Sequence, residues 1–417
     1  MLGAAAAPSH VCIVTLGGAR DKQYRSPGFR SLAREAGSYA VAVRDVTQHV
    51  PFLDLSPVTS AVEDGLLTEF AELVESGQFV NGPQVASFEE AFAAWCGVPH
   101  CVGTASGLDA LRLGLVAAGL EPGDEVVLPA MTFVATAEAV AQAGGRPVIA
   151  DASEHDWNLD PAAAEAAVTG QTRFLLPVHL YGQMADISAL GRVAARLGLT
   201  IVEDACQAHG AERDGFRAGS AGSAAAFSFY PGKSLGAMGD AGALVTADAG
   251  VADSVRALRE HGQRRKYDHD VEGWTARLDT IQAVVLLLKL PLLAGWNEER
   301  RDAAAFYHGA LRGVGDVMLP PVPRGSSPVW HLYVIRTAEP EDLAAFLADR
   351  GIVTGRHYPV PVHLTRAYEH LGYREGAFPV AEALARECLS LPIFPGITEV
   401  QATAVVEGIR DFFARGT

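Results

Sequence analysis

Lysine is scarce in this sequence, and one of its four lysines lies where it could do covalent chemistry. Against 29 arginines, the chain has only Lys22, Lys233, Lys266 and Lys289. Arginine stays protonated in proteins, whereas a desolvated lysine can lose its proton and attack a carbonyl carbon. Lys233 lies in the glycine-rich stretch FSFYPGKSLGAMGDAGAL, directly after an apolar run, which suits a lysine that joins a carbonyl cofactor. Lys289 lies in an apolar helical segment, where we expect its amine to reach out to water.

A carboxylate, an amide and an aromatic ring follow other apolar runs. Asp204 and Gln207 lie in LTIVEDACQAHGA, and Phe133 lies in LPAMTFVATAEAV. Pyridoxal phosphate needs a carboxylate at its pyridine nitrogen, because the negative charge keeps that nitrogen protonated and the ring electron-withdrawing. The Gln207 amide could donate to the phenolic oxygen, and Phe133 could stack on the ring. An Asp at a strand end is by itself a common helix cap, so the Asp204 motif alone is a weak signal. Core packing explains Phe133 equally well.

The turn in VGTASGLDAL could hold a phosphate. It leads into a helix with Ser106 as the N-cap and Asp109 three residues later, the pattern of a capping box. The exposed N–H groups of Gly107 and Leu108, together with the helix dipole, favour an anion. Capping and anion binding are compatible here, so the motif alone does not separate them.

The elements that must position these groups alternate along the chain. From about residue 60, short apolar runs indicate buried strands, and helical spacing separates most of them. This alternation predicts an α/β fold whose large, mostly parallel sheet has helices on both faces. Ligands of such sheets bind beyond the carboxyl ends of the strands. We expect strands at 125–128, 147–150, 174–178, 199–202, 225–229 and 243–245, and helices at 108–118, 134–143, 161–168 and 187–197.

The two ends of the chain differ from this pattern. Residues 1–50 hold six basic and three acidic residues in a chain of net charge −16, and we expect a loosely packed extension. Past residue 278 we expect one long helix to about Leu311, kinked near Pro291, and then a smaller unit with a strand at 329–336 and helices at 340–349, 380–388 and 399–414. The predicted divisions are therefore an extension at 1–50, a large domain at 51–300 and a small domain at 301–417.

Charge, apolar run length and the spacing of cysteines and histidines argue against several kinds of ligand and location. A net charge of −16 disfavours binding to nucleic acid or to an anionic membrane, so an anionic ligand would need a local cationic site. No apolar run reaches the roughly 18 residues of a membrane span, and the N-terminus lacks the basic start of a secretory signal. The five cysteines form no C-x-x-C pair, which predicts free thiols in a reducing cytoplasm. The histidines lack zinc-site spacing, and we expect no metal.

The order and spacing of these motifs resemble the pyridoxal phosphate-dependent sugar aminotransferases of the DegT/StrS family. The resemblance covers residues 51 to about 415 and rests on FVNGPQVASFEEAFA, PVHLYGQMAD, VEDACQAHGA, FSFYPGKSLGAMGDAGAL and RLDTIQA. It implies the fold-type I aminotransferase architecture, with a large cofactor-binding domain and a smaller C-terminal α/β domain. It also implies a homodimer in which the partner chain completes each active site.

The resemblance further implies roles for single residues. Lys233 would hold the cofactor as a Schiff base and later shuttle the substrate proton. Asp204 would pair with the pyridine nitrogen, Gln207 with the phenolate and Phe133 with the ring face. The phosphate would be bound by Gly107, Leu108, Ser228 and, from the neighbouring subunit, Thr275.

The implied reaction has two halves. L-Glutamate leaves its amine on the cofactor, giving the pyridoxamine form, and a keto sugar linked to a nucleoside diphosphate then takes that amine. The sequence around Lys233 is most similar to that of family members that act at carbon 3 of 3-keto-6-deoxyhexoses, as in antibiotic deoxysugar pathways. Regions expected to face the sugar contribute Tyr181, Lys266, His331, His357 and Tyr358.

Other activities stay open. The acceptor could be a 4-keto sugar or a keto-cyclitol such as an inosose. A sugar dehydratase of the same fold usually has histidine in place of the Schiff-base lysine, and Lys233 argues against that activity. A cofactor-binding homologue without turnover is a further alternative, which the presence of Lys233, Asp204 and Gln207 disfavours.

Three positions depart from the family pattern. Thr275 in GWTAR stands where the family usually has the Asn of G-x-N-x-R, and Ser234 follows the lysine where Asn is usual. Leu108 replaces the Thr of some members and leaves only its backbone N–H. The Thr275 hydroxyl can still donate but is shorter, so we expect a weaker hold on the phosphate.

Overall fold

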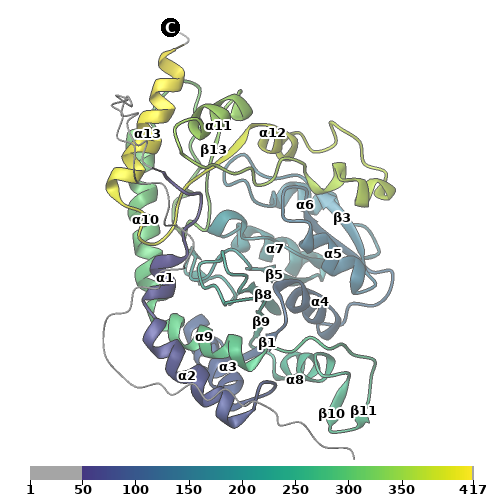
Figure 1. Ribbon diagram of the computed structural model, residues 1–417. Helices are drawn as coiled ribbons and strands as arrows, with labels where there is room; N and C mark the ends of the chain where they lie inside the picture. Colours follow the sequence, from purple (N-terminus) through teal and green to yellow (C-terminus); the bar gives the residue numbers. More distant parts are fainter. Residues whose placement is uncertain (1–48, 416–417) are drawn as a thin grey trace, which may run out of the picture. The chain divides into compact units, whose positions relative to one another are not determined.

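A computed structural model describes residues 49–415, and the structural statements below concern these residues (Figure 1). The extension expected at residues 1–50 therefore lies almost wholly outside the described residues. Val50 itself is buried in the fold and forms a parallel bridge with Ile352. Its N–H donates to the carbonyl of Gly351 at 2.9 Å. The folded part of the chain therefore includes residue 50.

Seven strands form the central sheet, in the order β1-β9-β8-β5-β4-β2-β3. Strands β3, β2, β4, β5 and β8 are parallel to one another, and β9 runs antiparallel to both β8 and β1. The α/β fold with a mostly parallel sheet is thus confirmed. The bounds are β1 His100–Thr104, β2 Glu125–Pro129, β3 Arg146–Ala150, β4 Thr172–Leu175, β5 Thr200–Asp204, β8 Ala224–Ser228 and β9 Gly242–Thr246.

Helices cover both faces of this sheet, because its strands are apolar on both sides. Ala226 of β8 packs with one group of helices and the next residue, Phe227, packs with the other. The first group is α4 Gly107–Ala117, α5 Ala135–Gln142 and α8 Ala249–Leu258. The second group is α3 Pro83–Cys96, α6 Pro161–Ala166, α7 Ile187–Leu197 and α9 Thr280–Lys289.

The C-terminal part packs around its own apolar cluster. The expected kinked helix is α9, a 3-10 turn at Leu290–Leu292 and α10 Leu293–Ala310, and Pro291 lies in the turn. The boundary expected near residue 300 falls inside α10 and stays a prediction. The remaining elements of this part are β13 Tyr333–Arg336, α11 Pro340–Ala348, η3 Val362–Leu364, η4 Arg366–Leu371, α12 Pro379–Glu387, β14 Cys388–Leu391 and α13 Glu399–Ala414. Strands β13 and β14 pair antiparallel.

Smaller elements complete the described chain. Helices α1 and α2 precede α3, and β10-β11 and β12-β6-β7 form two further small sheets in addition to β13-β14. Their bounds are α1 Ser56–Ser60, α2 Glu63–Ser76, η1 Leu180–Gly182, β6 Glu212–Arg213, β7 Phe216–Arg217, β10 Gln263–Arg265, β11 Asp268–His269 and β12 Ser326–Ser327.

The stretch Thr280–Ala310 is long and apolar enough to cross a membrane by length and composition, but 56% of its most apolar window is buried inside the fold. It is a core helix of this architecture. Lys289, which we expected to extend into water, is only 4% exposed, and its Nζ donates to the carbonyl of Gly236 at 2.9 Å. That prediction was wrong, because protein rather than solvent covers this side of α9.

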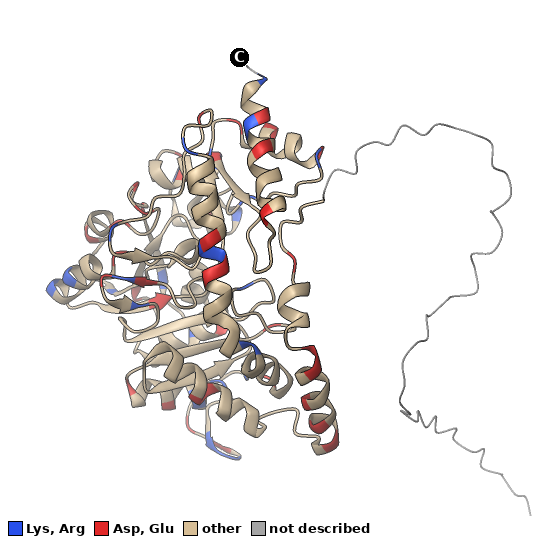
Figure 2. Cartoon of the chain, turned by 90° about the vertical axis from the view of Figure 1, so that its left-hand side faces the viewer, with Lys and Arg blue, Asp and Glu red and all other residues tan. Residues whose placement is uncertain are grey.

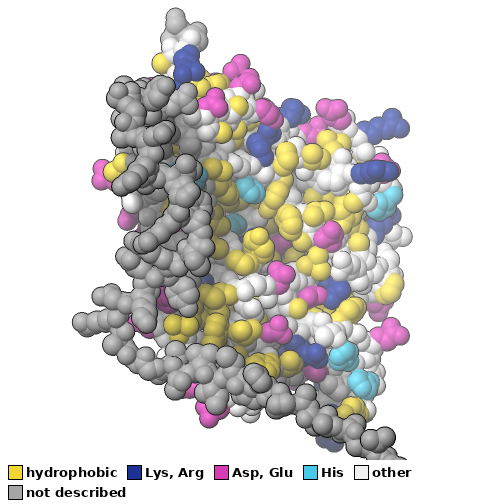
Figure 3. Space-filling view, in the orientation of Figure 1, with side chains coloured by type: hydrophobic (Ala, Val, Ile, Leu, Met, Phe, Trp, Pro, Cys, Tyr) yellow, Lys and Arg dark blue, Asp and Glu magenta, His cyan; other side chains and the backbone are white. Residues whose placement is uncertain are grey.

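The surface carries its acidic excess unevenly. Helix α2 has five acidic residues and no basic residue, and its acidic positions are coloured red in Figure 2. In Figure 3 apolar side chains gather over the middle of the face seen in Figure 1, with charged side chains interspersed. Exposed apolar clusters of this kind are common where proteins contact partners.

Candidate active site

A cavity of about 750 Å³ opens at the carboxyl ends of the parallel strands. Loops that follow β1, β2, β4, β5 and β8 line it together with residues of the C-terminal part. Ten of the thirteen site residues expected from the sequence lie in its wall: Gly107, Leu108, Phe133, Asp204, Gln207, Ser228, Lys233, His331, His357 and Tyr358. Tyr181, Lys266 and Thr275 do not line it.

Lys233 is held in the loop between β8 and β9. Its N–H donates to the carbonyl of Tyr230 at 2.8 Å, which closes a tight turn. Burial lowers the pKa of the Lys233 ammonium, and the neighbouring Cys206 and Asp204 partly offset this effect. A lysine of lowered pKa has a larger neutral fraction, and the neutral amine is the form that attacks a carbonyl carbon.

Asp204, the last residue of β5, is held at both carboxylate oxygens. The Thr136 hydroxyl donates to Oδ2 at 2.7 Å, and the N–H of Cys206 donates to Oδ1 at 3.2 Å. The hydroxyl of Thr132 lies 2.7 Å from that of Thr136 and extends the chain of hydrogen bonds. Thr136 was not among the site residues expected from the sequence, although it lies three residues after Phe133 in the same stretch. The carboxylate is therefore fixed in direction at the cavity wall.

Gln207 is oriented by a residue that lies behind the wall. Its Oε1 accepts from the N–H of Tyr181 at 2.6 Å, and its Nε2 donates to the Tyr358 hydroxyl at 3.0 Å. The Tyr181 hydroxyl donates to the carbonyl of His357. In this structure Tyr181 thus positions other residues of the site, and a direct contact with sugar stays a prediction.

The N-terminus of α4 offers free backbone donors. Ser106 caps the helix by accepting from the N–H of Asp109 at 3.0 Å. Among residues 49–415, the N–H groups of Gly107 and Leu108 have no partner. A Cβ at Gly107 would lie 2.7 Å from Cβ of Ser228, so only glycine lets the helix start approach the end of β8 this closely. These donors and the Ser228 hydroxyl form a cradle of the kind that binds phosphate.

The remaining wall residues are aromatic. Phe133 is 51% exposed and its ring centre lies 5.6 Å from that of Tyr358, so core packing does not explain it. Burial, followed by the charge of Lys233, lowers the pKa of His331 well below its usual value and that of His357 to about 4. His357 bonds through Nδ1 to the Ser390 hydroxyl at 2.8 Å. Both histidines are therefore neutral at neutral pH and can act as hydrogen-bonding groups.

Thr275 and Lys266 are exposed, outside the cavity of their own chain. The Thr275 hydroxyl lies 2.9 Å from Nε2 of His261. Lys266 follows β10 and its ammonium lies 5.3 Å from the ring centre of Tyr267. A role for either residue at a cofactor or substrate requires a second chain and stays a prediction.

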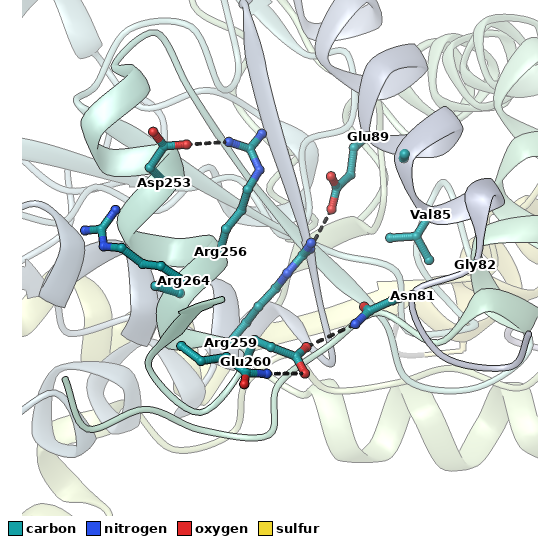
Figure 4. A pocket seen from close by; sticks show the side chains of 12 residues that line it. Asn81, Gly82, Val85, Glu89, Asp253, Arg256, Arg259, Glu260 and Arg264 are labelled. Carbon is teal, nitrogen blue, oxygen red and sulfur yellow. Dashed lines mark hydrogen bonds and ion pairs between the residues drawn. The ribbon is translucent and has the colours of Figure 1, made fainter. Parts of the chain in front are cut away.

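A second hollow, of about 400 Å³, lies between α3 and α8 (Figure 4). Its arginines are paired with carboxylates, as the dashed lines show for two of them. Arg259 contacts Glu89 at 2.5 Å, and Arg256 contacts Asp253 at 3.0 Å. Arg264, at its edge, pairs with Asp270 at 3.1 Å. In the described part of the chain this hollow therefore offers an anionic ligand little unpaired positive charge.

The described residues contain no group of three or more His, Cys, Asp and Glu placed to hold a metal ion. The cavity residues instead fit pyridoxal phosphate. The cradle of free N–H groups at α4 suits its phosphate, the fixed carboxylate of Asp204 suits its ring nitrogen, and the Lys233 amine suits its aldehyde. The half-exposed ring of Phe133 suits its flat face.

Comparisons with known proteins agree with this fit. Residues 61–410 match the DegT/DnrJ/EryC1/StrS aminotransferase family. A dTDP-3-amino-3,4,6-trideoxy-alpha-D-glucose transaminase from Streptomyces venezuelae is 46% identical to this chain, covering 89% of this chain and 98% of that protein. A UDP-N-acetyl-3-dehydro-alpha-D-glucosamine 3-aminotransferase from Acidithiobacillus ferrooxidans is 40% identical, covering 87% and 97%.

A solved structure has the same fold. The crystal structure of S. venezuelae DesV in complex with a ketimine intermediate is similar to this chain with a TM-score of 0.85 and 46% identity, and covers 87% of this chain and 98% of that one. The chain belongs to the DegT/DnrJ/EryC1/StrS family of pyridoxal phosphate-dependent aminotransferases.

Proposed function

We propose that this enzyme transfers the amino group of L-glutamate to carbon 3 of a nucleoside-diphosphate-linked 3-keto-6-deoxyhexose in the cytoplasm, in the biosynthesis of a deoxysugar of the kind found in antibiotics. The observation that carries the proposal is the meeting of Lys233, Asp204 and the α4 cradle in one cavity. The names of the two relatives, both of which concern an amino group at carbon 3 of a nucleotide sugar, support the position of transfer.

Each group of the cavity has a role in this proposal. Bound pyridoxal phosphate supplies an aldehyde that carries the amino group and a ring that withdraws electrons from the substrate carbon. Lys233 binds the cofactor and moves the substrate proton, a task that its lowered pKa favours. Asp204 keeps the ring nitrogen protonated, and the α4 N–H groups with Ser228 bind the phosphate. Wall groups that can bond sugar hydroxyls include the neutral His331 and His357 and the hydroxyl of Tyr358.

An exposed apolar patch supports a homodimer. Phe79, Val80, Met238 and Ile281 are each 40% exposed or more. They are neighbours, because Val80 forms a bridge with Asp279, next to α9, and the N–H of Met238 donates to the side chain of Gln282 at 2.8 Å. A second copy of the chain on this patch would cover apolar surface and bring exposed donors such as Thr275 and Lys266 to another chain's cavity.

The glutamate half-reaction tests the activity without the sugar. Glutamate added to the yellow enzyme should shift the spectrum of the bound cofactor and release 2-oxoglutarate in one turnover. The Asp204→Asn variant should still bind cofactor but lose nearly all of this single-turnover rate, because the ring nitrogen loses its carboxylate. Near-normal rates in that variant, or no release of 2-oxoglutarate by the wild type, would contradict the proposal.

A further inference from the structure

A buried pair of side chains lies behind the wall of the large cavity. His179, in the loop after β4, and Glu203, in β5, are both fully buried, and neither lines the cavity. Nε2 of His179 lies 2.8 Å from Oε2 of Glu203. Glu203 directly precedes Asp204, and successive side chains of a strand point to opposite faces of the sheet. The two neighbouring carboxylates of β5 therefore serve different surroundings.

The hydrogen bonds of this pair fix its protons. The N–H of Ala185 donates to Nδ1 of His179 at 3.2 Å, so the ring carries its proton on Nε2 and donates it to Glu203. Burial raises the pKa of Glu203, but the hydrogen bonds from His179 and from backbone N–H groups outweigh burial and lower it. The carboxylate is therefore charged. Its backbone donors, at 2.7 to 3.0 Å, are Gly219, Ala221 and Gly222.

The His179 ring closes a turn that contains Tyr181. One ring nitrogen bonds to Glu203 and the other bonds to the N–H of Ala185, so the ring holds both ends of residues 179–185. Inside this turn Tyr181 has a φ of 60°, a left-handed conformation that is unfavourable for residues other than glycine. Such a conformation persists only where the surrounding structure holds it. The pair is placed to do so.

Tyr181 in turn decides which end of the Gln207 amide faces the cavity. Oε1 of Gln207 accepts from the N–H of Tyr181 at 2.6 Å, and Nε2 points the other way and donates to the Tyr358 hydroxyl at 3.0 Å. An amide nitrogen has two N–H groups, and among residues 49–415 only one of those of Gln207 has a partner. Without the Tyr181 N–H the amide could turn over and present its oxygen, which would repel a phenolate.

We propose that His179 is a positioning residue for the cofactor. Held by Glu203, it fixes the turn that carries Tyr181, and it thereby keeps the Gln207 amide nitrogen directed at the phenolic oxygen of pyridoxal phosphate. His179 itself touches neither cofactor nor substrate. The inference rests on the cofactor-binding part of the proposed function, and it does not depend on which sugar accepts the amino group.

The affinity of the apoenzyme for two ligands tests the proposal. One ligand is pyridoxal phosphate, and the other is 3-deoxypyridoxal phosphate, which lacks the phenolic oxygen. His179→Leu should raise the dissociation constant of pyridoxal phosphate about tenfold, as expected for loss of one hydrogen bond to a charged group. It should leave that of the deoxy analogue nearly unchanged, because the analogue offers Gln207 no acceptor.

Two further substitutions at the same position complete this test. His179→Gln, whose amide can still donate to Glu203, should restore most of the affinity for pyridoxal phosphate. His179→Asn can still accept from the N–H of Ala185 but is too short to reach Glu203. It should lose affinity as His179→Leu does, and it carries the test if His179→Leu does not fold.

A double-mutant cycle shows whether His179 acts through Gln207. Gln207→Leu should weaken binding of pyridoxal phosphate by a similar factor. Adding His179→Leu to it should then cost little more, because both changes remove the same hydrogen bond. The matched control is His363→Leu, since His363 is buried outside the cavity wall with Nε2 3.1 Å from Oε1 of Glu382. That variant should melt at a lower temperature and bind both ligands as the wild type does.

The outcomes separate this inference from the proposed function. Equal losses of affinity for the two ligands in His179→Leu would show that the residue only supports the fold, and would overturn the inference. Wild-type affinity in His179→Leu together with a loss in Gln207→Leu would overturn the inference alone. Wild-type affinity in Gln207→Leu would overturn both the inference and the proposed contact of Gln207 with the cofactor.

Discussion

The hydroxyl of Thr136 donates to Oδ2 of Asp204 at 2.7 Å, across 68 residues of sequence. Thr136 lies at the start of α5, in the segment that also brings Phe133 into the cavity. One segment after β2 therefore places an aromatic ring in the cavity wall and fixes the carboxylate of Asp204. In the proposed function these two groups meet the face and the edge of the cofactor ring. The direction of Asp204 is set by this neighbouring segment as well as by its own strand.

Removing this hydroxyl should weaken cofactor binding. Thr136→Val keeps the shape of the side chain and loses the donor to Asp204. Because a hydrogen bond to a charged group contributes about 1.5–3 kcal/mol, we expect the dissociation constant of pyridoxal phosphate to rise about tenfold or more. Fluorescence titration of the apoenzyme measures it.

The control for Thr136→Val is Thr246→Val, in β9. Thr246 is also buried, and its hydroxyl donates to a backbone carbonyl, that of Ser223, at 2.6 Å. The Thr246→Val variant should have a lower melting temperature and an unchanged affinity for pyridoxal phosphate. Equal affinities in wild type and Thr136→Val would mean that the hydroxyl does not orient Asp204.

Lys233 should be the residue that carries the cofactor. Borohydride reduction of the enzyme with pyridoxal phosphate should attach the label to a peptide that contains residue 233, because this is the lysine of lowered pKa in the large cavity. Lys233→Met should abolish the label, and Lys289→Met should keep it. Peptide mapping by mass spectrometry that found the label on Lys266 or Lys289 would refute the assignment.

Thr275→Val tests the expected contribution of a second chain to the phosphate. Loss of one charge-assisted hydrogen bond, at roughly 1.5–3 kcal/mol, should weaken cofactor affinity by about tenfold or more. Turnover at saturating cofactor should change much less, since the lost contact is remote from the reacting carbon. Thr68→Val, an exposed threonine of α2, serves as the control. Unchanged affinity in Thr275→Val would show that one chain holds the phosphate alone.

Acid should destabilise the fold partly through His209. This side chain is fully buried against Phe227 and Phe229, and burial is the main cause that lowers its pKa from 6.5 to about 3. Between these two values the unfolded chain binds a proton that the folded chain does not, so stability is full above about pH 6.5 and falls as the pH drops toward 3.

Urea unfolding over this pH range measures the effect. His209→Leu should reduce the pH slope of the unfolding free energy by about one proton. Phe229→Leu removes packing against the same ring and should lower stability equally at every pH. A slope in His209→Leu equal to that of the wild type would show that another group takes up the proton.

The sequence predicted the bounds of a helix well where a capping residue marks the start of that helix. The helices expected at 187–197 and 399–414 match α7 and α13, because Asp186 and Thr398 cap them with their own side chains. Strand β1 was missed, because HCVGT has polar ends and a glycine in fourth position in place of an apolar run. Its burial comes from its neighbour β9, which lies far along the sequence.

Much of the site could be predicted because motifs place chemistry at strand ends. The hydrogen-bond partners that orient the site residues could not be predicted. The bonds from Thr136 to Asp204 and from Tyr181 to Gln207 depend on the order of strands in the sheet, and no local pattern contains that order. The burial of Lys289 escaped prediction for the same reason, since the chain that covers it comes from the loop around Gly236.

The structure of the product decides which carbon of which keto sugar receives the amino group. The enzyme is incubated with pyridoxal phosphate, L-glutamate and a panel of nucleoside-diphosphate-linked keto sugars, with an inosose as comparison, and the products are identified by NMR. We expect an amino group at carbon 3 of a 3-keto-6-deoxyhexose. An amino group at carbon 4, or turnover of the keto-cyclitol alone, would contradict this expectation.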